Sequence, residues 1–340
     1  MSDQRAIDSI QRLLAARGHG PAQAEPQPFA GNSRIYRVRA GPCDYIAKWY
    51  FSRPEDPRNR LAVEFDFLKI ARTAGIDCVP EPIARDDRIS VALYSALPGT
   101  PVQDVTERHV VQAIGLLEAL NRSDVRGRGE RLPAASEACF SLDEHVALVE
   151  RRIGRLEEAL RCRAHDGEAR DLVDRMRFVW QSVVPRIHRE LMDLGIRPTE
   201  VLTQDERCLS PSDFGLHNAL EAPDGTLGFV DFEYAGWDDP AKTVNDFFCQ
   251  PQVPVDWRHR ELFESRFLGL FPDPPRGRRR ARAMFPIFAI KWCCILLNVL
   301  EPGALERMRH ANPDIDIVAL RGGRLREACA RLENLLLPDG

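Results

Sequence analysis

The sequence changes character near residue 98, and this change limits what the chain can fold into. Four strand-like runs precede it, at residues 33–38, 45–50, 81–85 and 89–94, together with helical patterns at residues 1–18 and 58–74. After Leu97, Pro98 and Gly99, nearly every segment with a clear period is helical. We therefore predict an α+β fold with two lobes, a small β-rich lobe over residues 1–97 and a larger, mainly helical lobe over residues 98–340.

The second part of the chain is predicted to be a set of helices with one interruption. Helical periodicity is found at residues 106–120, 142–163, 168–194, 257–270, 278–300 and 317–336. Residues 202–232 interrupt this series with short strand-like runs and loops. Residues 121–135, rich in Arg, Gly and Pro, indicate a surface loop. The interruption is the segment that carries most of the candidate chemistry.

Charge and hydropathy narrow the possible environments and partners. The net charge of −4 and the pI near 6.1 do not indicate a nucleic-acid-binding protein. The longest apolar segment, residues 284–300, is interrupted by Pro286, Lys291 and Asn298. It falls short of the roughly 18 apolar residues that indicate a membrane span. We expect a cytoplasmic protein without nucleic-acid or membrane partners, and the oligomeric state stays open.

Three polar residues in the interruption have the spacing that phosphoryl transfer needs. Asn218 follows Asp213 by five residues, and Asp231 ends a short apolar run further along. One carboxylate can accept the proton of an incoming hydroxyl, while an Asn oxygen and a second carboxylate hold Mg²⁺ on nucleotide phosphates. Each residue alone also fits a turn or strand-end role. The set therefore needs support from elsewhere in the chain.

That support comes from the N-terminal part. Lys48 ends a strand pattern, and Glu64 lies 16 residues later in the first long helical pattern. A lysine so placed can reach the α- and β-phosphates of a nucleotide, and a helix glutamate can orient it. Upstream, the polar turn that contains Gly31, Asn32, Ser33 and Arg34 is placed to close over phosphates with its backbone N–H groups. The parts follow one another in the order of a kinase.

The segments SPSDFGLHN and VDFEYAGWDDPAKTVNDF resemble the paired signatures of the aminoglycoside phosphotransferase and choline kinase-like superfamily. This resemblance implies a bilobal, protein-kinase-like fold and the use of ATP and Mg²⁺. It implies that Asp213 is the catalytic base and that Asn218 and Asp231 bind the metal. Lys48 and Glu64 would position the phosphates. Backbone contacts to adenine would come from a hinge made of Ser95, Ala96 and Leu97.

Two features near Asp213 depart from the family or stay open. The family commonly has His two residues before the catalytic Asp, where this chain has Pro211. That substitution is expected to change the packing of the loop more than its chemistry. His217, next to Asn218, is interpreted either as a phosphate or substrate contact or as a hydrogen-bonding brace of the loop.

Five residues are candidates for binding the acceptor: Glu233, Trp237, Asp238, Lys291 and Asn298. The first three follow Asp231, and core packing is the alternative for Trp237. The last two share one face of an apolar helix pattern. Because an unpaired buried lysine is costly, Lys291 is expected either to face a polar cavity or to form a structural ion pair.

The acceptor itself is the least constrained part of the prediction. The arginines between residues 276 and 282 are best explained as a solvated basic helix face, and they also argue against a polycationic acceptor. We predict a phosphotransferase that acts on a hydroxyl of a small metabolite, of a neutral or anionic sugar type. Aminoglycoside, choline-like and fructosamine-type acceptors are the alternatives. A nucleotide-binding pseudokinase regulator is the alternative of another class.

Overall fold

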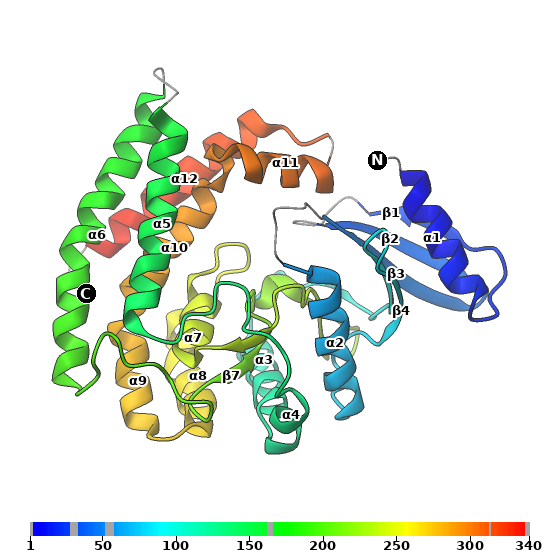
Figure 1. Cartoon of the computed structure of the whole chain (residues 1–340), viewed down its shortest axis with the longest axis horizontal. Helices are drawn as coiled ribbons and strands as arrows, with labels where there is room; N and C mark the ends of the chain where they lie inside the picture. Colours follow the sequence, from blue (N-terminus) through cyan, green and yellow to red (C-terminus); the bar gives the residue numbers. More distant parts are fainter. Residues whose placement is uncertain (1–2, 28–32, 52–57, 162–165, 313, 337–340) are drawn as a thin grey trace. The chain divides into compact units, whose positions relative to one another are not determined.

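The computed structural model describes residues 3–27, 33–51, 58–161, 166–312 and 314–336. They pack as two compact units, drawn together in Figure 1. The first unit contains Met1–Ser136, Leu209–Gly236 and Arg307–Ile315, and the second contains Glu137–Cys208, Trp237–Glu306 and Asp316–Gly340. Each unit thus gathers segments that are far apart in the sequence, whereas the predicted lobes follow the chain linearly.

The first unit is built on an antiparallel sheet of five strands in the order β1-β2-β3-β5-β4. Their bounds are β1 (Gln23–Pro26), β2 (Ser33–Ala40), β3 (Cys43–Tyr50), β4 (Pro82–Asp86) and β5 (Val91–Ser95). The four predicted strands correspond to β2 to β5. The tight turn between β2 and β3, at Gly41 with φ of 61°, lets the two longest strands pair along their whole length.

The two faces of this sheet have different roles. Helix α1 (Asp3–Ala15) buries Ile10 and Leu14 in a cluster with Ala47 and Trp49 of β3. Because successive side chains of a strand point to opposite faces, Lys48 lies on the face away from this cluster. Helix α2 (Arg60–Thr73) begins at Asn59, whose side chain accepts a hydrogen bond from the backbone of Ala62. The alternation of β3 therefore directs apolar side chains toward α1 and polar side chains, including that of Lys48, away from it.

The rest of the first unit contains a small sheet of three short strands that frames the polar segment. β8 (Ala219–Glu221) pairs with both β6 (Thr100–Pro101) and β9 (Leu227–Phe229). Helix α3 (Glu107–Leu120) contacts β9. Helix α4 (Ser123–Arg128) lies within the predicted surface loop, so that loop prediction is wrong for these six residues. Its polar, glycine-containing sequence conceals the helix, which buries only Val125.

The second unit is mainly helical. Its helices include α5 (Leu142–Arg161), α6 (Gly167–Asp193), α7 (Pro240–Cys249), α8 (Arg260–Phe267), α9 (Pro274–Ala283), α10 (Phe285–Leu296) and α12 (Ile317–Leu336). Short 3₁₀ helices lie at Trp257–His259, Leu268–Leu270 and Leu297–Leu300. The strands β7 (Cys208–Ser210) and β10 (Gly236–Asp238) and helix α11 (Pro302–Ala311) lie where the chain passes between the units.

Two helix predictions need correction. The single helix predicted at residues 278–300 is divided into α9 and α10, which meet at 47°. Pro286 stands in the first turn of α10, and a proline is accommodated at a helix start and not in its interior. No helix was predicted at the position of α7, although Asp239 and Pro240 form a strong signal for a helix start.

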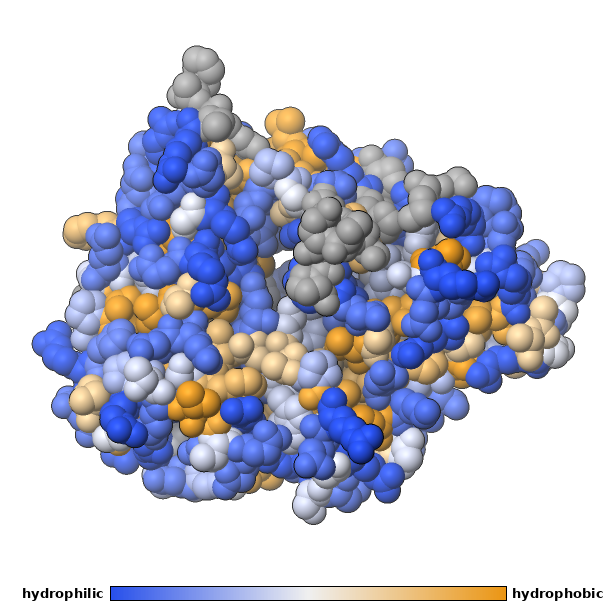
Figure 2. Space-filling model, viewed as in Figure 1, coloured by the Kyte–Doolittle hydropathy of each residue, from blue (hydrophilic) through white to orange (hydrophobic). Residues whose placement is uncertain are grey.

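The exposed surface agrees with the ordinary composition of the chain. On the face drawn in Figure 2, hydrophilic residues predominate and hydrophobic residues are interspersed among them. Among the described helices, none is by itself long and apolar enough to cross a membrane. The bent pair of α9 with residues 285–300 passes that test only when its two parts are taken together.

Candidate active site

Lys48 lies at the centre of a buried ionic cluster in the first unit. Its Nζ is 2.8 Å from Glu64 Oε2 and 2.7 Å from Asp231 Oδ1. Burial alone would lower the pKa of Lys48, but Asp231, Glu64 and Glu233 outweigh it and raise this pKa well above its ordinary value. The ammonium is therefore held in its charged form.

Neighbouring side chains fix the Glu64 carboxylate. Tyr50, two residues beyond Lys48 on the same face of β3, donates to Glu64 Oε2 at 2.6 Å. The Tyr50 and Tyr94 hydroxyl oxygens are 2.7 Å apart. The backbone N–H of Phe232 donates to Glu64 Oε1 at 3.2 Å. Glu64 thus links β3, α2 and the segment that follows β9, and it holds Lys48 in one orientation.

Asp231 adopts a backbone conformation that is uncommon outside glycine, with φ of 68°. Ser212, directly before Asp213, has the same φ. Non-glycine residues in this region cost about 1 to 3 kcal/mol and gather at functional sites. The strain at both positions marks the two segments in which the sequence places the base and a metal ligand.

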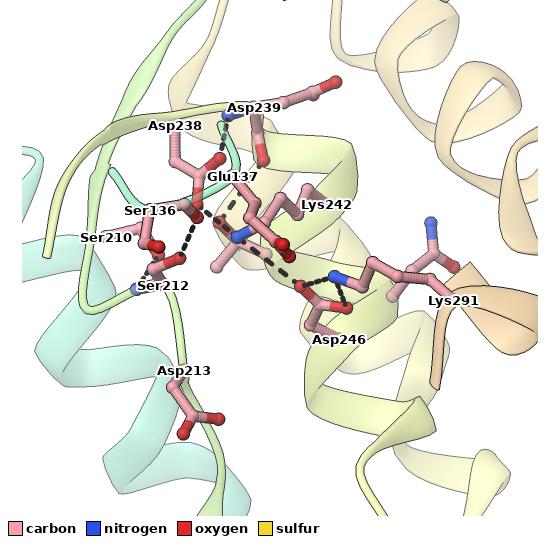
Figure 3. Close-up of polar contacts among 12 residues, drawn as sticks. Ser136, Glu137, Ser210, Ser212, Asp213, Asp238, Asp239, Lys242, Asp246 and Lys291 are labelled. Atoms are coloured by element: carbon pink, nitrogen blue, oxygen red, sulfur yellow. Dashed lines mark hydrogen bonds and ion pairs between the residues drawn. The ribbon is translucent and has the colours of Figure 1, made fainter. Parts of the chain in front are cut away.

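The loop that carries Asp213 is held from the backbone side. The Ser212 hydroxyl donates from Oγ to the carbonyl of Ser136 at 3.1 Å, and the Ser212 N–H donates to Ser210 Oγ at 2.9 Å (Figure 3). The Asp213 side chain is 34% exposed. The loop is therefore braced through Ser212 while the Asp213 carboxylate reaches solvent.

A β-hairpin brings Asn218 and Asp231 to the same end of two paired strands. Asn218 directly precedes β8, Asp231 comes soon after β9, and Val230 N–H donates to the Asn218 carbonyl at 2.9 Å. The Asn218 side-chain Nδ2 donates to the Asp213 carbonyl at 3.0 Å. Because the amide is planar, this contact turns Oδ1 to the opposite side. The hairpin thus explains how the two predicted metal ligands, 13 positions apart in the sequence, come to the same end of the paired strands.

The donor set of this region fits a hard divalent cation. Carboxylate oxygens of Glu64, Asp231 and Glu233 lie within 4.8 Å of one another. Oxygen ligands of this kind, together with an amide oxygen, are what Mg²⁺ prefers. Of these three carboxylates, Lys48 contacts those of Glu64 and Asp231, and its positive charge offsets part of their negative charge. That Asn218 and Asp231 hold a magnesium ion stays a prediction.

Glu233 has protein partners inside the first unit. It is 3% exposed, accepts from Ser33 Oγ at 2.9 Å, and lies 3.8 Å from Arg60 Nε. Burial, with the negative charge of Asp231, raises the pKa of Glu233 to about 7. Glu233 therefore ties the start of β2 to the segment after Asp231, and its predicted part in acceptor binding stays a prediction.

The polar turn predicted to close over phosphates is described only in part. Gly31 and Asn32 lie outside the described residues. The Arg34 side chain bonds Asp3 and lies over the Trp49 ring at 5.5 Å.

In the predicted hinge, the backbone N–H groups have protein acceptors. Ser95 N–H donates to Glu81 O at 2.9 Å, and Ala96 N–H lies 3.4 Å from Asp44 O. The roles of Ser95, Ala96 and Leu97 toward adenine stay predictions.

The other acceptor candidates lie in the second unit. Lys242 lies between Asp238 and Asp246, at 2.6 and 3.5 Å, and Lys291 lies 2.6 Å from Asp246 (Figure 3). Lys291 is 3% exposed and forms an ion pair with Asp246, as one of its two interpretations expects, and its role in acceptor binding stays a prediction. Trp237, 6% exposed, packs in the core.

Asn298 lies at the end of the same helical region. Oriented to donate, its amide reaches Glu301 Oε1 at 3.1 Å and the Cys294 carbonyl at 3.3 Å. A role of Asp238 or Asn298 in acceptor binding stays a prediction.

Sequence reasoning missed Tyr50, Arg60 and Ser212 as parts of the site. For Tyr50 a signal existed, because a residue two positions from a functional strand residue shares its face. Arg60 and Ser212 carried no such signal. Their roles depend on contacts with Glu233 and Ser136, which are distant in the sequence.

Comparisons with known proteins agree with this geometry. The sequence profile described as the phosphotransferase enzyme family matches residues 26–252. No curated protein matches the sequence significantly.

Solved structures share the fold over nearly the whole chain. A choline kinase from Streptococcus pneumoniae has a TM-score of 0.58 at 13% identity, covering 97% of this chain and 99% of that one. A choline/ethanolamine kinase family protein from Mesorhizobium loti has a TM-score of 0.53 at 18% identity, with coverage of 96% and 95%. A spectinomycin phosphotransferase in complex with ADP and spectinomycin has a TM-score of 0.57 at 11% identity, with coverage of 95% and 98%. These similarities confirm the predicted α+β, kinase-like fold.

Proposed function

Since the chain belongs to the phosphotransferase enzyme family, we propose that it transfers the γ-phosphate of ATP to a hydroxyl group of a small metabolite. The observation that carries this proposal is the convergence of Lys48, Glu64 and Asp231 in one buried cluster. These residues come from a strand, a helix and a hairpin end, and together they match what phosphoryl transfer requires.

The proposed reaction assigns a task to each part of the site. Asp213 accepts the proton of the acceptor hydroxyl, whose oxygen forms a bond to the γ-phosphorus while the bond from phosphorus to the ADP oxygen breaks. Lys48, held by Glu64, neutralises charge on the phosphates. When bound by Asn218 and Asp231, Mg²⁺ supplies further positive charge for the phosphate oxygens. Such preplaced charges act most strongly in a site that excludes water.

The nucleotide half of this proposal has the stronger support. A related fold is solved with ADP, which supports a nucleotide as the phosphate donor. The Ser33 hydroxyl, in the segment predicted to close over phosphates, donates a hydrogen bond to Glu233. This bond would hold the start of β2 close to the phosphate-binding residues.

For the acceptor, a neutral or anionic sugar-type metabolite is the leading candidate. The arginines that suggested this class include Arg276, Arg280 and Arg282, which pair with Glu200, Asp239 and Glu264. Their charge is therefore largely balanced, which weakens the argument against a cationic acceptor. The structures with a similar fold include a choline kinase and a spectinomycin phosphotransferase, so any test has to include amino alcohols and aminoglycosides.

A panel assay tests the proposal directly. MgATP is incubated with the protein and with choline, ethanolamine, spectinomycin, neutral hexoses or sugar phosphates, and ADP release is measured against a water-only control. We expect acceptor-dependent ADP release, which Asp213→Asn lowers by at least about 100-fold while nucleotide binding persists. Wild-type turnover in Asp213→Asn would remove Asp213 from the role of base. ATP binding without turnover of any acceptor would instead favour a regulatory pseudokinase.

A further inference from the structure

We propose that His217 is a positioning residue that orients the Asp213 carboxylate through Nε2, an inference that rests on the proposed function. The ring nitrogen Nε2 lies 3.3 Å from Asp213 Oδ1. A carboxylate can only accept a hydrogen bond, so Nε2 carries the hydrogen and donates. Of the two side chains, His217 is 4% exposed and Asp213 is 34% exposed. The buried ring therefore contacts the carboxylate from its inner side.

The other ring nitrogen shows that the imidazole does not occupy this position for packing alone. His217 Nδ1 is buried and has no hydrogen-bond partner among the residues that the structure describes. Leaving a buried polar atom unpaired costs about 1 to 3 kcal/mol. An apolar side chain of similar size would fill the same space without this cost. The contact from Nε2 to Asp213 is the feature that an apolar replacement would lose.

The local fold explains how one short segment holds Asp213 at two points. Residues Leu216–Asn218 form a 3₁₀ turn, which brings His217 and Asn218 back toward Asp213. Asn218 holds the Asp213 backbone carbonyl at 3.0 Å, and His217 holds the carboxylate. Pro211, two residues before Asp213, has no side-chain donor. His217 supplies a donor to the same loop from its other end.

In the reaction, His217 transfers no proton. Its N–H remains directed at Oδ1 while the hydroxyl proton moves to the Asp213 carboxylate and the acceptor oxygen bonds to the γ-phosphorus. The hydrogen bond limits rotation of the carboxylate, so that an oxygen is presented to the acceptor in one orientation. Misplacement of a reacting group by about 1 Å can lower a rate by about 100-fold.

Two amide substitutions separate this role from simple packing. The amide nitrogen of Gln reaches the place of Nε2 in a histidine, whereas that of Asn reaches only the place of Nδ1. We expect His217→Asn to lower kcat by about 10- to 100-fold with the KM for MgATP within about twofold of the wild type. His217→Gln should remain within about threefold of the wild-type kcat. Rates are measured with the best acceptor of the panel, or with water where none reacts. Equal losses in both variants would overturn the proposal.

A double-mutant cycle tests whether His217 acts through Asp213. If it does, His217→Asn lowers the residual rate of Asp213→Asn by less than about twofold, because the group that it orients is already altered. A full, additive loss in that background would show that His217 acts elsewhere. Wild-type turnover in Asp213→Asn alone would remove Asp213 from the role of base, whereas ATP binding by the wild type without turnover of any acceptor would contradict the proposed function, so the failures are distinguishable.

A spectroscopic measurement tests the contact independently of turnover. Long-range ¹H–¹⁵N spectra of the full chain, assigned with His217→Gln, should show His217 as the tautomer with hydrogen on Nε2. Asp213→Asn should shift that Nε2 resonance, while the other histidines remain unchanged. A hydrogen on Nδ1 alone, or a His217 signal that does not respond to Asp213→Asn, would overturn the proposal.

Discussion

Lys48 Nζ lies 2.7 Å from Asp231 Oδ1, although 183 residues separate them in the sequence. In the proposed reaction, Lys48 has to face nucleotide phosphates and Asp231 has to face a magnesium ion. In the structure the two side chains contact each other directly. The contact shows that both groups reach the same point, and it explains how this charge is balanced in the described structure.

Replacing Lys48 tests the phosphate contact. We expect Lys48→Met to lower kcat/KM for ATP by at least about 100-fold, since charge placement dominates phosphoryl transfer. The matched control is Lys69→Met, because Lys69 is an exposed lysine of α2. Steady-state kinetics of ADP release measure both variants. Unchanged kinetics in Lys48→Met would reduce this lysine to a structural member of the ionic cluster.

Replacing Asp231 tests the metal site. We expect Asp231→Asn to raise the Mg²⁺ concentration required for half-maximal turnover by about 10-fold or more, because one anionic oxygen ligand is lost. Asp77→Asn is the control, since the Asp77 side chain is 82% exposed. A magnesium titration at saturating ATP gives the result. An identical magnesium requirement in both variants would place the metal elsewhere.

Replacing Lys291 distinguishes its two interpretations. Removing one partner of a buried ion pair typically costs about 3 to 5 kcal/mol, so Lys291→Met should lower the free energy of unfolding by that order. Urea unfolding at pH 7 measures the loss. The structural role also predicts that the remaining folded enzyme keeps its KM for the acceptor. A raised acceptor KM with unchanged stability would return Lys291 to the acceptor site.

Two glycines with positive φ provide a test of backbone packing. Gly99 has φ of 120°, and a Cβ there would lie 2.5 Å from the Glu221 carbonyl oxygen across the β6–β8 pair. We expect Gly99→Ala to destabilise the protein by several kcal/mol. Gly41→Ala, with φ of 61° and open space around the Cβ, should cost only about 1 kcal/mol. Thermal unfolding of the two variants should separate them clearly, and equal midpoints would contradict the predicted clash.

Asp86 predicts a pH dependence that involves α1. Hydrogen bonds from Arg88, and from Ser9 of α1, lower the pKa of Asp86 to about 2. Its stabilising contribution is therefore present above pH 4 and is lost as the pH falls toward 2. We expect Asp86→Asn to be less stable than the wild type by about 1 to 2 kcal/mol at pH 6, allowing for the exposed Arg88. Denaturant unfolding at pH 6 and pH 3 should show this difference narrowing, and a constant difference would assign it to packing.

Local signals explain which elements could be predicted from the sequence. The runs that became β2 to β5 carry their own alternation and turns, and α2 and α3 carry their own periodicity and caps. Helix α4 escaped prediction because its six residues bury a single apolar side chain. The division at Pro286 escaped because an apolar pattern continues on both sides of the break.

The sequence by itself determined the fold class, the family and the order of the candidate chemical groups, because periodicity, turns and short motifs are local properties of the chain. Only the tertiary structure decided that Lys291 pairs with Asp246, that Glu233 is engaged with Ser33, and that His217 contacts Asp213. Such outcomes depend on burial and on distances between side chains, which determine whether a charged group meets a partner or an open site. The sequence contains the groups, but packing selects their partners.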